Sequence, residues 1–246
     1  PQNPTGTTFK KEELEAICDL VIAENKRRGD GEKKLYVMFD QMYWHLTYGA
    51  IKHYDPVSLR SEMREYTIYI DAISKVFAAT GVRVGWSMGP ATVIGKMKAI
   101  LTHIGAWAPM AEQKAVANYL GKRESIKSYL SHFKKEIEER LRSIYDGFIQ
   151  LKNEGLSVDA ITPEAAIYLT IKVDLAGKKT VEGKLLENQA DVTAYLLSAA
   201  GLAVVPFYAF GADKSSPWYR LSVGTCKKEE IGEMIGKLRE ALVKLS

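Results

Sequence analysis

Four side chains of different chemistry lie near the ends of apolar runs in the first third of the sequence. Asp40 follows the run LYVMF, Tyr43 comes shortly after it, and Lys75 and Arg83 lie further along the chain. A deprotonated amine attacks electrophilic carbon, and a guanidinium binds paired oxygens of a phosphate or carboxylate. Together with a carboxylate and a phenol, these groups would offer one ligand an acid, a base and an anion-binding fork.

Three apolar runs predict the strands that would position these side chains. They are LYVMF at 35–39, YTIYI at 66–70 and VRVGWSMG at 82–89. Short continuous apolar runs are typical of strands buried on both faces of a parallel sheet, and open α/β sheets bind ligands beyond the carboxyl ends of their strands. We therefore expect the four side chains to share one sheet edge. Thr8 is a candidate N-cap for a helix that precedes these strands. Two further helices are predicted over 91–102 and 111–120.

The second half of the chain has the pattern of a smaller α+β unit. Apolar residues recur at helical spacing over 125–150 with charged residues between them, which predicts a long amphipathic helix. Strands are predicted at 166–175 and 218–224, and Gly201 is expected to end a helix that begins near Ala194. The predicted domains are 1–124, part of a larger sheet domain, and 125–246, the long helix with the smaller domain.

The composition is that of an ordinary soluble protein. The 246 residues are 46% hydrophobic and 26% charged, with a net charge of +4. Such a small, dispersed excess favours neither nucleic acid nor a membrane as partner, and no apolar run reaches the length of a membrane span. The two distant cysteines are expected to be reduced thiols of a cytoplasmic protein, and the four histidines lack the spacing of metal ligands.

The spacing of lysine, glycine and arginine around residue 80 is too specific to be accidental. Taken singly, a lysine near a strand end is usually solvated, and an aspartate after a strand usually caps a turn. A fixed pattern such as Lys75, Gly81, Arg83 and Gly85 is different. Four residues at about one in fifteen each give a chance match of roughly one in fifty thousand per starting position.

Four motifs in a fixed order carry a family resemblance. They are NPTG at 3–6, DQMY at 40–43, SKVFAATGVRVGW at 74–86 and YRLSVG at 219–224. The chain resembles the class I/II aminotransferases, and among them the aspartate aminotransferase group. These are fold type I enzymes that use pyridoxal 5′-phosphate. The resemblance implies an α/β fold: an incomplete, mostly parallel sheet of the large domain, followed by a C-terminal α+β domain.

The resemblance also implies a role for each motif residue. Lys75 would form the Schiff base with the cofactor and carry the proton, and Asp40 would pair with the pyridine nitrogen. Tyr43 and Asn3 would bind the phenolic oxygen of the ring. The guanidinium of Arg83 would hold the phosphate, while Arg220 would bind the substrate α-carboxylate.

Some positions depart from the family pattern. Ala72 stands where many relatives have a phosphate-binding serine, and Phe207 follows Pro206 where relatives often have glycine. Gly81 and Gly85 are expected to let the backbone approach closely. Because the chain opens inside the turn PQNPTG, we expect it to be the C-terminal portion of a longer protein, without the upstream phosphate-binding loop of the family.

Three hypotheses follow for the activity. The first is a transaminase that moves an amino group between an amino acid and a 2-oxo acid by a ping-pong route, as a cytoplasmic homodimer. The second keeps the cofactor but runs β-elimination or a related lyase reaction, because the motifs bind only groups that such enzymes share. The third is a non-catalytic fragment or assembly partner, and under either of the first two we expect the isolated chain to be inactive.

Overall fold

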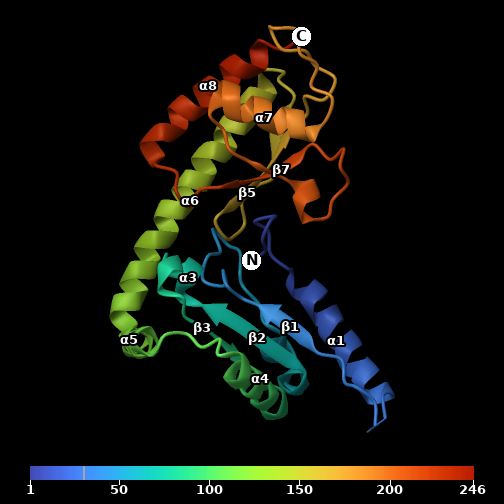
Figure 1. Ribbon diagram of the computed structural model, residues 1–246, viewed down its shortest axis with the longest axis vertical. Helices are drawn as coiled ribbons and strands as arrows, with labels where there is room; N and C mark the ends of the chain where they lie inside the picture. Colours follow the sequence, from blue (N-terminus) through green and yellow to red (C-terminus); the bar gives the residue numbers. More distant parts are fainter. Residues whose placement is uncertain (30) are drawn as a thin grey trace. The chain divides into compact units, whose positions relative to one another are not determined.

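The computed structural model describes residues 1–29 and 31–246 as two compact units. The first unit comprises Thr8–Ser131 together with Pro1, and the second comprises Gln2–Thr7 and His132–Ser246. Figure 1 shows the course of the chain through both units.

The first unit is built around a small sheet with helices before and after it. Its helices and strands, in chain order, are α1 (Lys11–Arg27), β1 (Val37–Asp40), α2 (Pro56–Leu59), β2 (Thr67–Ala72), α3 (Ile73–Val76), β3 (Gly85–Met88), α4 (Ala91–Ile104), α5 (Met110–Leu120) and the first part of α6 (Arg123–Asn153). The 3₁₀ turns η1 (Ser61–Glu65) and η2 (Thr80–Val82) precede β2 and β3.

The strand order β1-β2-β3 brings three chain segments to one edge of this sheet. β1 and β2 are parallel, with Asp40 opposite Ile70, whereas β2 and β3 are antiparallel, with Ala72 opposite Gly85. The carboxyl ends of β1 and β2 and the beginning of β3 therefore lie at the same edge. A Cβ on Gly85 would stand 3.0 Å from the carbonyl oxygen of Asp71, so this glycine does permit a close approach of the two strands.

Only one face of β1 is covered within the residues that the structure describes. Val37 and Phe39 pack with the buried side of α1, around Cys18, and Figure 1 shows this helix running beside the strand. The intervening residues Met38 and Asp40 are exposed, Met38 by 70%. The prediction of a strand buried on both faces was therefore wrong, because a run of apolar letters does not tell which side chains meet a cover.

Helix α1 begins two residues later than a Thr8 cap would place it. The backbone N–H of Lys10 donates to a carboxylate oxygen of Glu13 at 2.8 Å, and the N–H of Leu14 donates to the carbonyl of Lys10. The acid in the first turn thus satisfies the backbone ahead of it and also complements the positive end of the helix dipole. Lys10, not Thr8, is the N-cap residue.

The second unit is a four-stranded antiparallel sheet with three helices. Its elements are the remainder of α6, β4 (Val158–Ala160), β5 (Tyr168–Val173), α7 (Gln189–Ala200), β6 (Val205–Pro206), β7 (Trp218–Ser222) and α8 (Ile231–Val243), with the 3₁₀ turns η3 (Phe207–Phe210) and η4 (Lys228–Glu230). The strand order is β4-β5-β7-β6. Five of the six residues of β5 are buried, so this strand lies at the centre of the unit.

Helical spacing explains the core of the second unit. Along α6, the side chains of Ile137, Leu141, Ile144 and Phe148 are fully or nearly fully buried, three or four residues apart. Asn188 caps α7 by accepting from two backbone N–H groups, and Gly201 ends that helix in the left-handed conformation, as predicted.

The segment Gln2–Thr7 is fixed to β5 of the second unit. The hydroxyl of Thr170 donates to the carbonyl of Thr5 at 2.8 Å, and the N–H of Ala165 donates to the carbonyl of Gly6 at 2.9 Å. Gly6 has a φ of +71°, and a Cβ there would lie 2.3 Å from the carbonyl oxygen of Tyr168. This contact requires glycine at that position.

Three further features concern the whole described chain. Both cysteines, Cys18 and Cys226, are free thiols. Over residues 1–29 and 31–246, no three His, Cys, Asp or Glu side chains are grouped as a metal site requires. Among the helices of the same residues, none combines the length and the apolar content needed to cross a membrane.

Candidate functional site

Lys75 lies in the four-residue helix α3, directly after β2. Its side chain is half-buried. The turn that carries it is anchored by Phe77, whose ring contacts Tyr119 edge-on at 5.6 Å and stacks on Tyr129 at 5.9 Å between centroids. Ile73 and Val76 are buried beneath the turn. Packing of its neighbours thus holds the turn that carries the lysine.

Asp40 and Tyr43 lie at the end of β1 and in the turn that follows. Asp40 is exposed, and its carboxylate accepts from the backbone N–H of Met42 at 3.1 Å. Tyr43 is only 5% exposed. The turn is tight, because the N–H of Trp44 donates to the carbonyl of Gln41 and the N–H of Gln41 bonds the carbonyl of Ile70 on β2. Both predicted ring-binding residues of this unit therefore belong to one ordered segment.

Arg83 lies between η2 and β3 in the left-handed backbone conformation, with φ 61°. Its guanidinium is exposed and donates to the carbonyl of Thr80 at 3.0 Å. The carbonyl of the next residue, Val84, accepts from the N–H of Ile73, which joins this turn to the beginning of α3. Gly81, by contrast, has nothing within 4 Å of its would-be Cβ, so the expected close backbone approach does not occur there.

The sheet edge of the first unit therefore brings together the segments of Asp40, Lys75 and Arg83. Each segment is joined to the next by backbone hydrogen bonds at the ends of β1, β2 and β3. The edge thus offers an exposed carboxylate, a half-buried amine and an exposed guanidinium. This arrangement is the expected one for ligand binding beyond the carboxyl ends of parallel strands.

A second cluster of functional groups lies in the second unit, around Arg220 of β7. Its guanidinium donates to the side-chain carbonyl of Asn3 at 2.8 Å. It is sandwiched between the rings of Tyr168, at 4.7 Å, and Phe210, at 4.8 Å. Among the described residues, nothing accepts a hydrogen bond from its buried Nε. Aromatic rings hold a guanidinium in place without using its N–H groups, so the N–H groups not bonded to Asn3 remain to bind an anion.

The family model for aminotransferases of class I and II matches residues 1–238 of the chain. The chain belongs to this family. Its motifs SKVFAATGVRVGW and YRLSVG, with Asn3 of NPTG and Asp40 of DQMY, lie on the elements just described.

Individual aminotransferases are similar to the chain over nearly all its length. It is 30% identical over 230 residues to a probable aspartate/prephenate aminotransferase of Rhizobium leguminosarum bv. phaseoli, covering 93% of this chain and 53% of that protein. It is also 30% identical over 230 residues to the aspartate aminotransferase of Geobacillus stearothermophilus, covering 92% and 51%. The chain spans about half the length of the curated relatives that it matches.

A solved aminotransferase structure shares the fold. The aromatic aminotransferase of Pyrococcus horikoshii OT3 superimposes with a TM-score of 0.83 at 26% sequence identity, covering 99% of this chain and 58% of that chain. The predicted fold class, part of the fold type I architecture, is therefore confirmed. The family's cofactor is pyridoxal 5′-phosphate, as the resemblance implied.

The groups of this aminotransferase chain fit that cofactor by their chemistry. Pyridoxal phosphate presents an aldehyde, a ring nitrogen, a phenolic oxygen and a phosphate, which match an amine, a carboxylate, a phenol and a guanidinium. Lys75, Asp40, Tyr43 and Arg83 supply these groups within the first unit, and the fork of Arg83 retains N–H donors beyond the one bonded to Thr80. Ala72 offers the phosphate no hydroxyl.

Sequence reasoning missed two features of these clusters. Tyr168 and Phe210 were not predicted to enclose Arg220. The aromatic residues near them in the sequence were a signal from which this contact could have been predicted. Asp71, directly after the apolar run at 66–70, was given no role by the sequence. It proves to be a buried carboxylate that accepts from the indole N–H of Trp44 at 3.1 Å and from the N–H of Ala72 at 2.8 Å.

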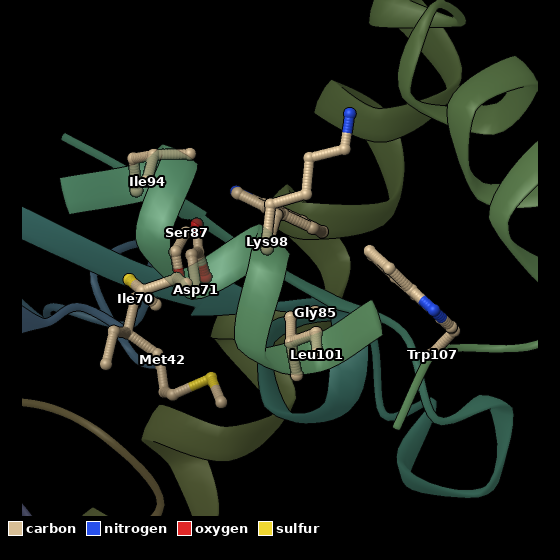
Figure 2. A pocket seen from close by; sticks show the side chains of 11 residues that line it. Met42, Ile70, Asp71, Gly85, Ser87, Ile94, Lys98, Leu101 and Trp107 are labelled. Carbon is tan, nitrogen blue, oxygen red and sulfur yellow. The ribbon is translucent and has the colours of Figure 1, made fainter. Parts of the chain in front are cut away.

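A cavity of about 460 Å³ lies between α4 and the sheet of the first unit. Figure 2 shows the side chains around it, with Asp71 and Ser87 on the strands and Lys98 on the helix. The lining is mostly apolar, and the side chain of Lys98 extends away from Asp71. Burial raises the pKa of the Asp71 carboxyl, and the nearby charge of Asp40 adds to the rise.

Proposed function

We propose that the whole protein is a pyridoxal-phosphate-dependent transaminase that transfers an amino group between an amino acid and a 2-oxo acid in two half-reactions. The observation that carries this proposal is the order β1-β2-β3, which joins the segments of Asp40, Lys75 and Arg83 at one sheet edge in a chain of this family. When bound, the cofactor withdraws the electrons released at the substrate Cα.

Lys75 is assigned the covalent bond to the cofactor and the proton transfer. A lysine attacks an aldehyde only when its amine is deprotonated. Lys75 would hold the cofactor, and its amine, when free, would move a proton to and from the substrate Cα. The half-buried position of Lys75 on an anchored turn supports this role.

The remaining residues are assigned to binding and orientation. Asp40 keeps the pyridine nitrogen protonated, and Tyr43 and Asn3 hydrogen-bond the phenolic oxygen. Arg83 holds the phosphate with its guanidinium. Their support is the family match and the geometry of each segment within its own unit.

Arg220 is assigned to the substrate α-carboxylate. Guanidinium and carboxylate form a bidentate pair, and a preorganised fork loses less entropy when it binds. The sandwich between Tyr168 and Phe210 supplies this preorganisation. The bond from Arg220 to Asn3 ties the carboxylate-binding residue to one proposed for the cofactor ring.

We also propose that the whole protein is a cytoplasmic homodimer and that the isolated 246-residue chain is inactive. The exposed carboxylate of Asp40, on an uncovered face of β1, supports the second statement. A carboxylate exposed to water attracts the protonated pyridine nitrogen more weakly than a desolvated carboxylate does. Normal turnover by the purified chain alone would contradict it.

The reaction is tested with the whole protein, an amino acid donor and a 2-oxo acid acceptor, by identifying the products. We expect equal amounts of new 2-oxo acid and new amino acid, without free ammonia. Ammonia together with a cleaved side chain would instead establish the lyase hypothesis. Lys75→Arg keeps the charge but cannot form the imine, so it should lower kcat by at least about 10⁴-fold. The control Lys96→Arg alters an exposed lysine of α4 outside the cavity lining and should leave kcat unchanged.

A further inference from the structure

The carboxylate of Asp71 is buried where two functional segments of the first unit meet. The residue is 6% exposed and is the penultimate residue of β2, four positions before Lys75. Its oxygens accept from the indole N–H of Trp44 and the backbone N–H of Ala72. Gln41 and Trp44 enclose the turn that carries Tyr43.

We propose that Asp71 is a positioning residue, whose carboxylate fixes the Tyr43 turn to the strand end that leads into Lys75. The inference rests on the proposed function, because positioning matters only if both segments bind one cofactor. The hydrogen bonds join residues 27 positions apart, so the link is tertiary and not a property of either turn alone. It acts in addition to the backbone bond from Gln41 to Ile70.

The donor pattern explains why a carboxylate suits this position. One side-chain N–H and one backbone N–H converge on Asp71, and an ionised carboxylate accepts from both. An asparagine offers one acceptor oxygen, and its NH₂ group would face one of the donors. Asp40 is the nearby acid, while Lys98 on the far side of the cavity extends away from Asp71 in Figure 2. Hydrogen bonds therefore hold this carboxylate in place.

A second carboxylate of the same unit provides a matched control. Asp55 accepts from the N–H groups of Val57 and Ser58 and from the hydroxyl of Tyr69, so it too is a partly buried acid with several donors. It caps α2, however, and lies outside the Tyr43 turn and the α3 turn. Asp55→Asn should reduce stability without a specific effect on the cofactor site.

The link itself is tested in the 246-residue chain without cofactor. Its four tryptophans give four indole N–H resonances in a ¹⁵N-correlated NMR spectrum, and Trp44→Phe identifies one of them. Asp71→Asn should move that resonance upfield and speed its hydrogen exchange by about tenfold, since it loses a charged acceptor. Asp55→Asn should leave it in place. An unmoved Trp44 resonance in Asp71→Asn would overturn the proposal, whatever the enzyme's activity.

The functional consequence is tested by cofactor affinity in the whole protein. Asp71→Asn and Trp44→Phe should each weaken pyridoxal phosphate binding about tenfold and shift the absorbance of the bound cofactor. The double variant should bind pyridoxal phosphate no more weakly than the weaker-binding single variant, because both substitutions break the same link. Asp55→Asn should bind as the unaltered protein does. If Asp71→Asn lowered only the melting temperature, as Asp55→Asn does, the positioning role would be refuted.

The two arms separate this inference from the proposed function. If the unaltered whole protein failed to bind pyridoxal phosphate through Lys75, the proposed function would fall and the positioning role with it. The Trp44 resonance would still report whether the hydrogen-bonded link exists. If the cofactor binds but none of the Asp71 and Trp44 variants changes its affinity or spectrum, only the present inference is wrong.

Discussion

The two units of the chain differ in how completely each covers its own sheet. In the second unit, β5 is buried along almost its whole length, with α6, α7 and α8 contributing buried side chains. In the first unit, β1 alternates between half-buried and exposed positions, and α4 has no buried residue. The second unit therefore derives its stability from a closed apolar core, whereas the first presents its reactive groups on a thin, partly uncovered sheet.

This difference separates two tasks. The second unit holds Arg220 between two aromatic rings, which suits the carboxylate-binding role proposed for it. The first unit places Lys75 on a short turn anchored by its neighbours, which leaves the amine accessible. Apolar burial in the first unit is concentrated under α1 and around the Lys75 turn. Local anchoring, more than a large core, supports the groups proposed to bind the cofactor.

The largest effect is expected from shortening an isoleucine in the closed core. Ile171 of β5 is fully buried, so Ile171→Ala should lower the free energy of unfolding of the second unit by about 4 kcal/mol. Ile100 of α4 is 59% exposed, and Ile100→Ala should change stability by less than about 0.5 kcal/mol. Urea unfolding followed by hydrogen exchange at β5 and α4 measures both. An equally large cost at Ile100 would break the comparison, since it would mean that the α4 face is covered.

A smaller loss of stability is expected at Gly6, where the NPTG segment packs against the backbone of Tyr168. Gly6→Ala would push a Cβ against the carbonyl of Tyr168 at a positive φ, so it should cost about 2–3 kcal/mol. Gly201 also has a positive φ but open space around it, and Gly201→Ala should cost only about 1 kcal/mol. Melting temperatures of the two variants provide the test. Equal shifts would show that the Gly6 contact does not constrain the NPTG segment.

The smallest of these effects is the acid sensitivity of the first unit. Burial lowers the pKa of His53 to about 4, and its Nε2 finds no acceptor or donor among the described residues. The unfolded chain therefore binds more protons between pH 6.5 and 4, and stability present above pH 6.5 is lost as the pH falls. We expect the free energy of unfolding to fall by about 1–2 kcal/mol. Part of the ring faces solvent, which keeps the loss below the value for a fully buried ring.

This loss is measured by urea unfolding of the first unit at pH 7 and pH 4.5. His53→Gln removes the titrating ring and should abolish the part of the pH dependence assigned to it. The second unit, whose single histidine is the exposed His132, should show a smaller change over the same range. A first unit whose pH dependence is the same with and without His53 would contradict the assignment.

The sequence predicted the periodic elements well. The long amphipathic helix, expected over 125–150, is α6 at Arg123–Asn153, and the helices expected at 91–102 and 111–120 are α4 and α5. Such elements follow from local spacing of apolar residues. The short β4, at Val158–Ala160, has no such spacing and was missed.

What the sequence did not predict depends on contacts between distant residues. Burial of β1 on one face only, and the hydrogen bond from Trp44 to Asp71, are decided by which segments meet in space. The bond between Arg220 and Asn3 joins residues 217 positions apart. The family resemblance supplied the chemical types of the site residues, but their supporting partners became visible only in the folded chain.

The central claim is that Lys75 is the residue that holds the cofactor. The direct test is to incubate the whole protein with pyridoxal phosphate, reduce it with borohydride, and map the labelled peptide by mass spectrometry. We predict one equivalent of label on Lys75, and none in Lys75→Arg. Label on a different lysine, or no label although the cofactor binds, would contradict the account.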